Sequence, residues 1–181
     1  MERCRLVFSG SGGQGVITAA IVLAEAAVLH DDLTAVQTQV YGAAARGGAT
    51  RSDVIISDID INFPKVVQPN VLVCLTQEAY NQYASIIRPG GLLITDKRYV
   101  ELQHKVDARQ VELPIYQTVM DKIGKPIVFN IFMLGAVVGL TGLVRAESIL
   151  KVLKTRIPEA FVAMNQEALQ LGVDLTADHQ G

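Results

Sequence analysis

The chain has 181 residues, a formal net charge of -2 and a hydrophobic share of 50%, while 19% of its residues are charged. A domain of this length buries roughly 70% of the surface that its unfolded chain exposes, so no cross-links are needed to hold the fold. The balanced charge argues against a general surface for DNA or RNA. The charged share lies below the typical value of about 25%, which leaves open subunit interfaces or a large buried sheet.

The longest apolar region is too short to favour membrane insertion, and the two cysteines are too few to favour an iron–sulfur cluster. The longest apolar region, 126–140, is interrupted by Asn130 and is too short to span a bilayer. No apolar stretch of signal-peptide length follows Met1, so we expect a cytoplasmic protein with no membrane contact. Cys4 and Cys74 lie in apolar runs typical of buried strands. An iron–sulfur cluster usually takes four thiolates, so these two cannot hold one alone.

The amino-terminal half alternates strand-like and helix-like patterns. Residues 5–9 form a short apolar run that ends at a glycine loop. Residues 16–29 repeat apolar side chains at helical spacing, so one stripe of this helix is expected to pack on a sheet. Strands are also predicted at 34–40 and at 54–56, the latter uniformly apolar as in a sheet covered on both faces.

The carboxyl-terminal part continues the alternation and then becomes helical. Further strands are predicted at 71–75, 92–95 and 111–113, and helices at 77–87, 114–124, 129–140, 146–155 and 159–171. The helix at 129–140 is apolar nearly all round, which is typical of a buried helix. Gly172 is expected to end the last helix. We see no repeat or linker, so residues 1–181 are interpreted as one α/β domain, Rossmann-like, with three layers and a mostly parallel sheet.

The stretch LVFSGSGGQGV at 6–16 has G-x-G-x-x-G spacing between a strand and a helix. Such a loop lets backbone N–H groups face an anion at the helix N-terminus. An NAD site also needs an acidic side chain about 20 residues on, at the tip of the second strand, where Gln39 stands here. The residues therefore favour a loop for helix packing, a partner or another phosphate ligand, with a dinucleotide site as the alternative.

A second stretch, YGAAARGGATR at 41–51, places small residues on both sides of Arg46. The second strand is expected to lie beside the first, so that this loop joins the ligand crevice and the guanidinium groups of Arg46 and Arg51 project from it. They would offer bidentate donors to an anion or a partner carboxylate. A solvated turn is the alternative, but the alanine content favours close approach of another surface.

Asn130 lies inside the most apolar helix and needs a hydrogen-bond partner if it is buried. It could cap a neighbouring loop, or it could reach a ligand or a partner chain. The three histidines are scattered and are interpreted as surface residues. Spacing alone reveals no catalytic triad, so no catalytic residue is assigned.

Five segments together resemble a known family, the gamma subunit of 2-oxoacid:ferredoxin oxidoreductases. They are GSGGQGV at 10–16, AVQTQVYGAAARGGATRSDVIIS at 35–57, PKVVQPNVLVCLTQEAY at 64–80, RPGGLLITD at 88–96 and NIFMLGA at 130–136. The resemblance covers about residues 5–170. The QTQ-Y and ARGG runs are most similar to the 2-oxoglutarate branch, with the pyruvate, branched-chain and indolepyruvate branches as alternatives.

The resemblance implies a complex in which thiamine diphosphate attacks the 2-oxo carbonyl, carbon dioxide leaves, and electrons pass through iron–sulfur clusters to ferredoxin. Coenzyme A then takes the acyl group. The thiamine site and the clusters belong to alpha, beta and delta-type partner subunits in this picture. This chain is then expected to hold no cofactor alone, to be inactive in isolation and to brace the active site or the coenzyme A entry region. A free NAD(P)- or flavin-binding oxidoreductase and a pure assembly scaffold are the rivals, and the isolated chain could form a homodimer.

Cofactor binding or partner contact is expected at two motifs and two further positions, without a bond-making role and without metal ligands. The first motif consists of Gly10, Gly12, Gly13, Gln14 and Gly15, the second of Tyr41, Gly42, Arg46, Gly47 and Gly48, and the further positions are Arg51 and Asn130.

Overall fold

The structure is a computed structural model that describes residues 3–40, 49–103 and 105–179. The strands are β1 (Cys4–Gly10), β2 (Thr34–Val40), β3 (Thr50–Ser57), β4 (Val71–Cys74), β5 (Gly91–Asp96) and β6 (Ala108–Leu113). The helices are α1 (Val16–His30), α2 (Gln77–Tyr83), α3 (Ile115–Lys122), α4 (Phe129–Thr141), α5 (Ala146–Arg156) and α6 (Glu159–Leu175), with short 3-10 turns η2 (Ala84–Ile86), η3 (Pro126–Val128) and η4 (Ala177–His179).

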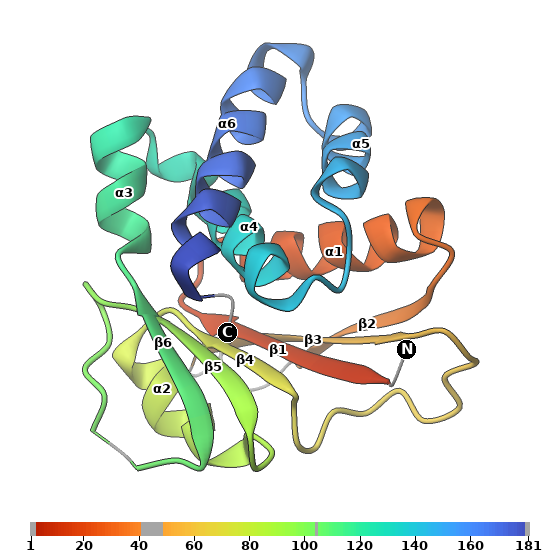
Figure 1. The fold of residues 1–181 in the computed structure, drawn as a ribbon, viewed down its shortest axis with the longest axis vertical. Coiled ribbons are helices and arrows are strands. Elements are labelled where there is room, and N and C mark those ends of the chain that lie inside the picture. Colours follow the sequence, from red (N-terminus) through yellow and green to blue (C-terminus); the bar gives the residue numbers. More distant parts are fainter. Residues whose placement is uncertain (1–2, 41–48, 104, 180–181) are drawn as a thin grey trace.

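The strands form one sheet in the order β2-β3-β1-β4-β5-β6 (Figure 1). Strands β1, β4, β5 and β6 pair in parallel, whereas β3 pairs antiparallel with both β1 and β2. Helices cover both faces of this sheet, so the predicted three-layer α/β fold with a mostly parallel sheet is confirmed.

The expectation that the second strand lies beside the first is wrong, because β3 lies between β1 and β2. A parallel neighbour needs a crossover connection of about a dozen residues or more, usually a helix. The connection from Val40 to Thr50 is too short for one. The chain therefore turns back and pairs β3 antiparallel, with Thr50 opposite Gly10 and Arg51 opposite Val40.

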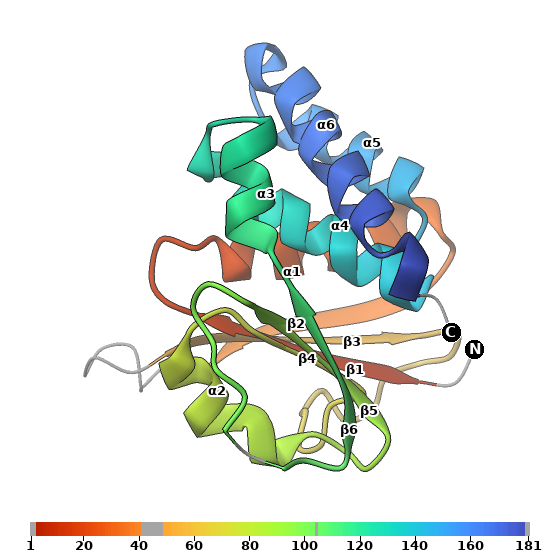
Figure 2. The ribbon, with the colours of Figure 1, turned by 60° about the vertical axis from the view of Figure 1, so that its left-hand side comes forward.

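Alternating side chains along each strand build two cores, one on each face of the sheet. Leu6 and Phe8 of β1 pack in the core that α1 and α4 cover, while Val7 packs with Tyr80 of α2 in the other. Helices α1, α3, α4, α5 and α6 lie on the first face and α2 lies on the second (Figures 1 and 2). The second face is thus covered by much less helix than the first.

Helices α4 and α6 pack closely because glycines stand at their contact. A Cβ atom on Gly172 would overlap the carbonyl oxygen of Phe132 and lie 3.0 Å from Cα of Gly135. The expectation that Gly172 ends the last helix is wrong, since α6 continues to Leu175. Gly172 instead allows α6 to pack closely on α4. No local sequence pattern reveals such a contact between helices.

Candidate functional site

The glycine loop joins the end of β1 to the start of α1, and its own glutamine closes it. The N–H of Ser11 donates to Oε1 of Gln14 at 2.8 Å, and Nε2 of Gln14 donates to the carbonyl oxygen of Leu75 at 3.3 Å. A Cβ atom on Gly10 would overlap Oε1 of Gln14 and lie 3.3 Å from Cβ of Leu75. Gly10 is therefore required so that the Gln14 side chain can fold back over the strand end.

Gly12 and Gly13 form the open part of this loop. Both are exposed, and a Cβ atom at either position would meet nothing within 4 Å. Gly13 has φ 86°, in the left-handed region that favours glycine. The loop precedes the N-terminus of α1, where the helix dipole favours negative charge. This part of the loop can receive a partner carbonyl or a phosphate.

Asn130 braces the loop from the first turn of α4. Its Nδ2 donates to the carbonyl oxygen of Gly15 at 3.4 Å. A Cβ atom on Gly15 would lie 2.6 Å from the same Nδ2, so the asparagine packs directly on the residue that caps α1. Of the roles that the sequence left open for Asn130, the structure shows the contact with a neighbouring loop.

Arg51 does not project from a loop, contrary to the expectation. It lies in β3, and Nε and Nη2 donate to the two carboxylate oxygens of Asp53 at 2.6 and 2.9 Å. Nη2 also donates to the carbonyl oxygen of Val66 at 3.1 Å, and the guanidinium lies 5.2 Å from the ring centroid of Tyr83. Residues two apart on a strand share a face, so Arg51 and Asp53 meet under the sheet and the arginine is occupied.

The second motif lies outside the described residues: Tyr41, Gly42, Arg46, Gly47 and Gly48. The flanking residues Val40 and Thr50 belong to strands β2 and β3. The pairings of Val40 with Arg51 and of Thr50 with Gly10 put both flanks at the glycine-loop end of the sheet.

The dinucleotide alternative is opposed by topology as well as by residue type. The ribose acid of a dinucleotide site stands at the tip of a parallel neighbour of β1, but on this side the neighbour is the antiparallel β3. Asp31 is engaged elsewhere, because its carboxylate accepts the backbone N–H of Arg145 at 2.8 Å and the hydroxyl of Ser148 at 2.5 Å. Gln14 also occupies one of the loop N–H groups that a phosphate would use.

An aromatic cluster beside the loop escaped the sequence reasoning. Tyr99, Tyr116 and Phe129 line a cavity of about 130 Å³ that also touches Gly13 and Gln14. The ring centroids of Tyr99 and Tyr116 are 5.5 Å apart with an edge-to-face geometry. The sequence around Tyr99 shows neither helix nor strand periodicity. The one signal in the sequence was that this stretch follows a parallel strand, where ligand sites commonly lie.

Asp96, at the carboxyl end of β5, holds the backbone at Arg98 and at Tyr116 in place beside this cluster. It is fully buried, and its two oxygens accept the backbone N–H groups of Arg98 and Tyr116 at 2.8 Å each. Burial raises the pKa of Asp96, and these two hydrogen bonds offset only part of that rise. The carboxyl thus anchors the segment after β5 and the start of α3 rather than facing solvent.

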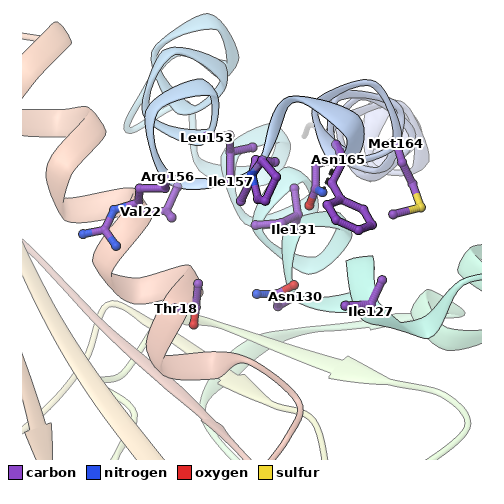
Figure 3. A pocket seen from close by; sticks show the side chains of 12 residues that line it. Thr18, Val22, Ile127, Asn130, Ile131, Leu153, Arg156, Ile157, Met164 and Asn165 are labelled. Carbon is purple, nitrogen blue, oxygen red and sulfur yellow. Dashed lines mark hydrogen bonds between the residues drawn. The ribbon is translucent and has the colours of Figure 1, made fainter.

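An apolar hollow lies among the helices and is lined in part by Asn130 (Figure 3). It has a volume of about 360 Å³, lies among α1, α4, α5 and α6, and shares Asn130 with the loop. Ile127 and Phe161 at its edge are 73% and 47% exposed. Arg156 is neutralised by an ion pair with Glu25. Exposed apolar surface of this kind is typical of contact sites for other chains.

The two cysteines do not fit an iron–sulfur cluster. Cys4 belongs to the core under α1 and α4, and Cys74 to the core under α2, so the thiols lie on opposite faces of the sheet. Burial raises the pKa of Cys4 to about 11 and also raises that of Cys74, whereas cluster ligands are thiolates. Within the described ranges, no group of three metal-ligating side chains occurs. None of the helices described there combines the length and apolarity needed to cross a bilayer.

The fold and the site together define an α/β domain of the Rossmann-like class whose glycine loop is closed by its own glutamine. The chain belongs to the pyruvate ferredoxin/flavodoxin oxidoreductase family, whose model matches residues 5–175. The family expected from the sequence is thereby confirmed.

Similar proteins narrow the place of the chain within this family. It is 41% identical to 2-oxoglutarate synthase subunit KorC of Methanocaldococcus jannaschii, over 97% of this chain and 95% of that protein. It is 30% identical to pyruvate synthase subunit PorC of Methanothermobacter thermautotrophicus, over 92% of each. A crystal structure of a keto/oxoacid ferredoxin oxidoreductase gamma subunit from Geobacter sulfurreducens matches with a TM-score of 0.87 at 40% identity, covering 97% of this chain and 99% of that one.

Proposed function

We propose that the chain is the gamma subunit of a coenzyme A-acylating 2-oxoglutarate:ferredoxin oxidoreductase. The enzyme would convert 2-oxoglutarate to succinyl-coenzyme A with reduction of ferredoxin, or run in reverse. The observation that carries this proposal is the near full-length match to a 2-oxoglutarate synthase subunit at 41% identity, against 30% for the pyruvate subunit. Residues 1–181 would form one gamma-type domain, located in the cytoplasm.

The subunit would brace the active site without making or breaking bonds. Thiamine diphosphate supplies the decarboxylation chemistry of such a complex, and we assign it, the clusters and the main part of the coenzyme A site to alpha, beta and delta-type partners. The open glycines Gly12 and Gly13, with the second motif at 41–48, would contact a partner backbone or a coenzyme A phosphate. Their exposure and lack of neighbours at the start of α1 support this role.

The first experiment is a tagged pull-down of this chain from its native cells under anaerobic conditions. The eluate is assayed for coenzyme A-dependent reduction of a viologen dye with 2-oxoglutarate, pyruvate, 2-oxoisovalerate and indolepyruvate in parallel. We expect larger partner chains and activity with 2-oxoglutarate. Activity with another 2-oxoacid alone would reassign the substrate, and a chain that elutes alone with a bound nucleotide would refute the subunit role.

The role of the glycine loop is tested with Gly12→Glu in the purified complex. A Cβ atom at this position would meet nothing within 4 Å, so the fold should persist while bulk and negative charge enter the contact space. We expect a loss of complex yield if the loop contacts a partner, or a rise in the Michaelis constant for coenzyme A of about tenfold if it contacts a phosphate. Gln103→Glu, exposed between β5 and β6, is the control. Unchanged yield and unchanged Michaelis constants would remove the loop from the proposed site.

A further inference from the structure

A second hollow lies at the opposite end of β1 from the glycine loop. We call it the basic hollow; it has a volume of about 550 Å³ and is lined by Arg5, Phe63, Lys65, Val67, Gln68, Arg88 and Pro89. Arg5 is near the start of β1, whereas the glycine loop begins at its last residue. At about 3.3 Å per residue the two sites are separated by roughly 17 Å of strand. The basic hollow is thus distinct from the site in the proposed function.

Within residues 3–40, 49–103 and 105–179, the cations of the basic hollow have no carboxylate partner. Arg51, Arg145 and Arg156 form ion pairs elsewhere in the molecule. No ion pair joins Arg5, Lys65 or Arg88 to the described part of the chain, and no described lining residue carries a carboxylate. The chain as a whole has a net charge of -2, so this concentration of positive charge is local.

The position of Arg5 is fixed by the backbone beneath it. Its N–H donates to Oδ1 of Asn70 at 2.9 Å, and the N–H of Asn70 donates to the carbonyl oxygen of Arg5 at 2.7 Å. This reciprocal pair ties the start of β1 to the residue that precedes β4. The guanidinium of Arg5 is therefore presented from a rigid strand, while Arg88 and Lys65 are exposed at its sides.

Apolar side chains stand among these cations. The segment 58–70 between β3 and β4 is anchored by Val66, which is buried in the core on the α2 face of the sheet. Phe63 and Val67 of the same segment point outward and are 59% and 62% exposed. In Figure 1 this segment lies at the end of the sheet where the chain begins, on the face that α2 covers. Because Val66 anchors this segment, its exposed apolar side chains are held in a fixed arrangement that another chain could contact.

We propose that the basic hollow docks an acidic polypeptide segment of a partner protein, with an apolar side chain of that segment packed on Phe63 and Val67. Charge complementarity selects the occupant, because covering three cations with a neutral surface would leave them desolvated and unpaired. A small anion such as phosphate would satisfy the charges but would leave both apolar side chains in water. A polypeptide satisfies both kinds of group. This inference does not depend on the proposed function.

The test uses the purified full chain and a fluorescein-labelled peptide, Glu-Asp-Glu-Leu-Phe-Asp-Glu, with binding followed by fluorescence anisotropy at about 50 and about 300 mM salt. Lys65→Glu combined with Arg88→Glu should weaken binding at least about tenfold, because both changes reverse exposed charges. Phe63→Ser should weaken it several-fold and leave the salt dependence unchanged. Lys122→Glu combined with Lys151→Glu, on other surfaces, is the matched control and should leave binding unchanged.

Three results would overturn the proposal. The first is that the wild-type chain does not bind the peptide. The second is that the control pair weakens binding as much as the Lys65→Glu and Arg88→Glu pair does. The third is that the Phe63→Ser variant binds the peptide normally and that pyrophosphate displaces the labelled peptide as well as unlabelled peptide does. The last result would indicate a small-anion site. Circular dichroism checks that each variant is folded. Chemical-shift mapping on the wild-type chain is the independent measurement, and shifts confined to Phe63, Val67 and Arg88 with their neighbours are expected.

Discussion

At Gly15 the chain passes from loop to helix in a conformation that L side chains rarely adopt. Its φ is 72°, and Asn130 fills the space where a Cβ atom would stand. Gln14 has a similar role on the other side of the loop, where its side chain holds Ser11 and Leu75 together. The motif therefore depends on contacts that its own residues make within the chain, in addition to whatever its open glycines bind.

Gly15→Ala is expected to reduce the free energy of unfolding by about 2 kcal/mol, because a left-handed alanine is strained and its Cβ overlaps Asn130. Gly12→Ala is the control, with an expected change below about 0.5 kcal/mol, since nothing lies near its Cβ position. Urea denaturation of the isolated chain measures both. Equal midpoints for the two variants would show that Asn130 does not pack on Gly15.

The Arg51–Asp53 ion pair is the second constraint at the residue scale. Both side chains are nearly buried, with 13% and 7% of their surface exposed. Asp53→Asn leaves the Arg51 guanidinium in that site with a weaker partner, so a loss of about 3 kcal/mol is expected. Glu25→Gln removes a pair that is 35–39% exposed and should cost less than about 1 kcal/mol. Chemical denaturation at neutral pH compares them, and similar costs for both would contradict the burial argument.

At the scale of elements, the contact between α4 and α6 holds the helical layer together. Gly135 and Gly172 stand at this contact, and a Cβ atom at either would overlap the backbone of the facing helix, while a Cβ atom on Gly139 would overlap Oγ1 of Thr176, the residue that caps α6. Alanine would normally favour a helix over glycine by about 1 kcal/mol. These positions are therefore occupied by glycine in spite of helix propensity, because only glycine permits this distance.

Gly172→Ala is expected to destabilise the chain by about 2 kcal/mol, since the added methyl meets backbone atoms of α4 that cannot rotate away. Gln166→Ala, exposed on the same helix, should change stability by less than about 0.5 kcal/mol. Thermal and urea unfolding both report the difference. A stabilised Gly172→Ala variant would mean that α6 moves away from α4 at little cost.

Asp31 links α1 to α5 and should make that link dependent on pH. Burial alone raises its pKa, but hydrogen bonds from Ser148 and Arg145 outweigh burial, and the net pKa lies below the ordinary value of 3.8. The folded state then gains stability from the ionised carboxylate above the ordinary pKa and loses it as the pH falls through the lowered one.

Asp31→Asn should therefore cost about 1–2 kcal/mol at pH 7, and the difference from wild type should vanish in acid below the lowered pKa. Urea midpoints measured from pH 7 down to about pH 2.5 follow the effect. Asp32→Asn is the control, because the neighbouring Asp32 is exposed, and its expected cost is below about 0.5 kcal/mol. A difference for Asp31→Asn that is constant over the whole range would exclude its ionisation as the cause.

At the scale of the whole molecule, one sheet carries two cores. Leu6 and Phe8 face the helical layer, while Val7 faces α2, and every central strand repeats this division. Neither core can persist without the sheet, so we expect them to unfold together as small domains usually do. The two cysteines report on this, because Cys4 lies in one core and Cys74 in the other.

Neither thiol should react with a thiol-specific reagent at pH 8 in the native chain, because both are buried and burial raises the pKa of Cys4 to about 11. In Cys4→Ala and Cys74→Ala variants, each with one remaining thiol, labelling should appear at the midpoint of each variant's own unfolding transition followed by circular dichroism. Labelling of one thiol well before that midpoint would show that one face of the sheet opens independently.

Periodicity in the chain was sufficient to place most of the elements. The strand predicted at 34–40 and the helix at 16–29 match β2 and α1 within one residue, and the buried helix at 129–140 matches α4. These patterns are local, because the alternation of apolar residues depends on neighbours within one or two turns. The glycine loop and the family resemblance were likewise visible in the sequence alone.

Only the tertiary structure decided which strand lies beside β1, where the Arg51 guanidinium goes and what fills the space at Gly15. Each of these depends on residues distant in sequence or on the length of a connection, and residue spacing does not encode such pairings. Gly172 shows the same limit, since a glycine at a helix contact and a glycine at a helix end look alike in the sequence. The sequence alone thus determined the elements and the family, whereas the packing of the elements determined which site residues are free to bind and which are already engaged.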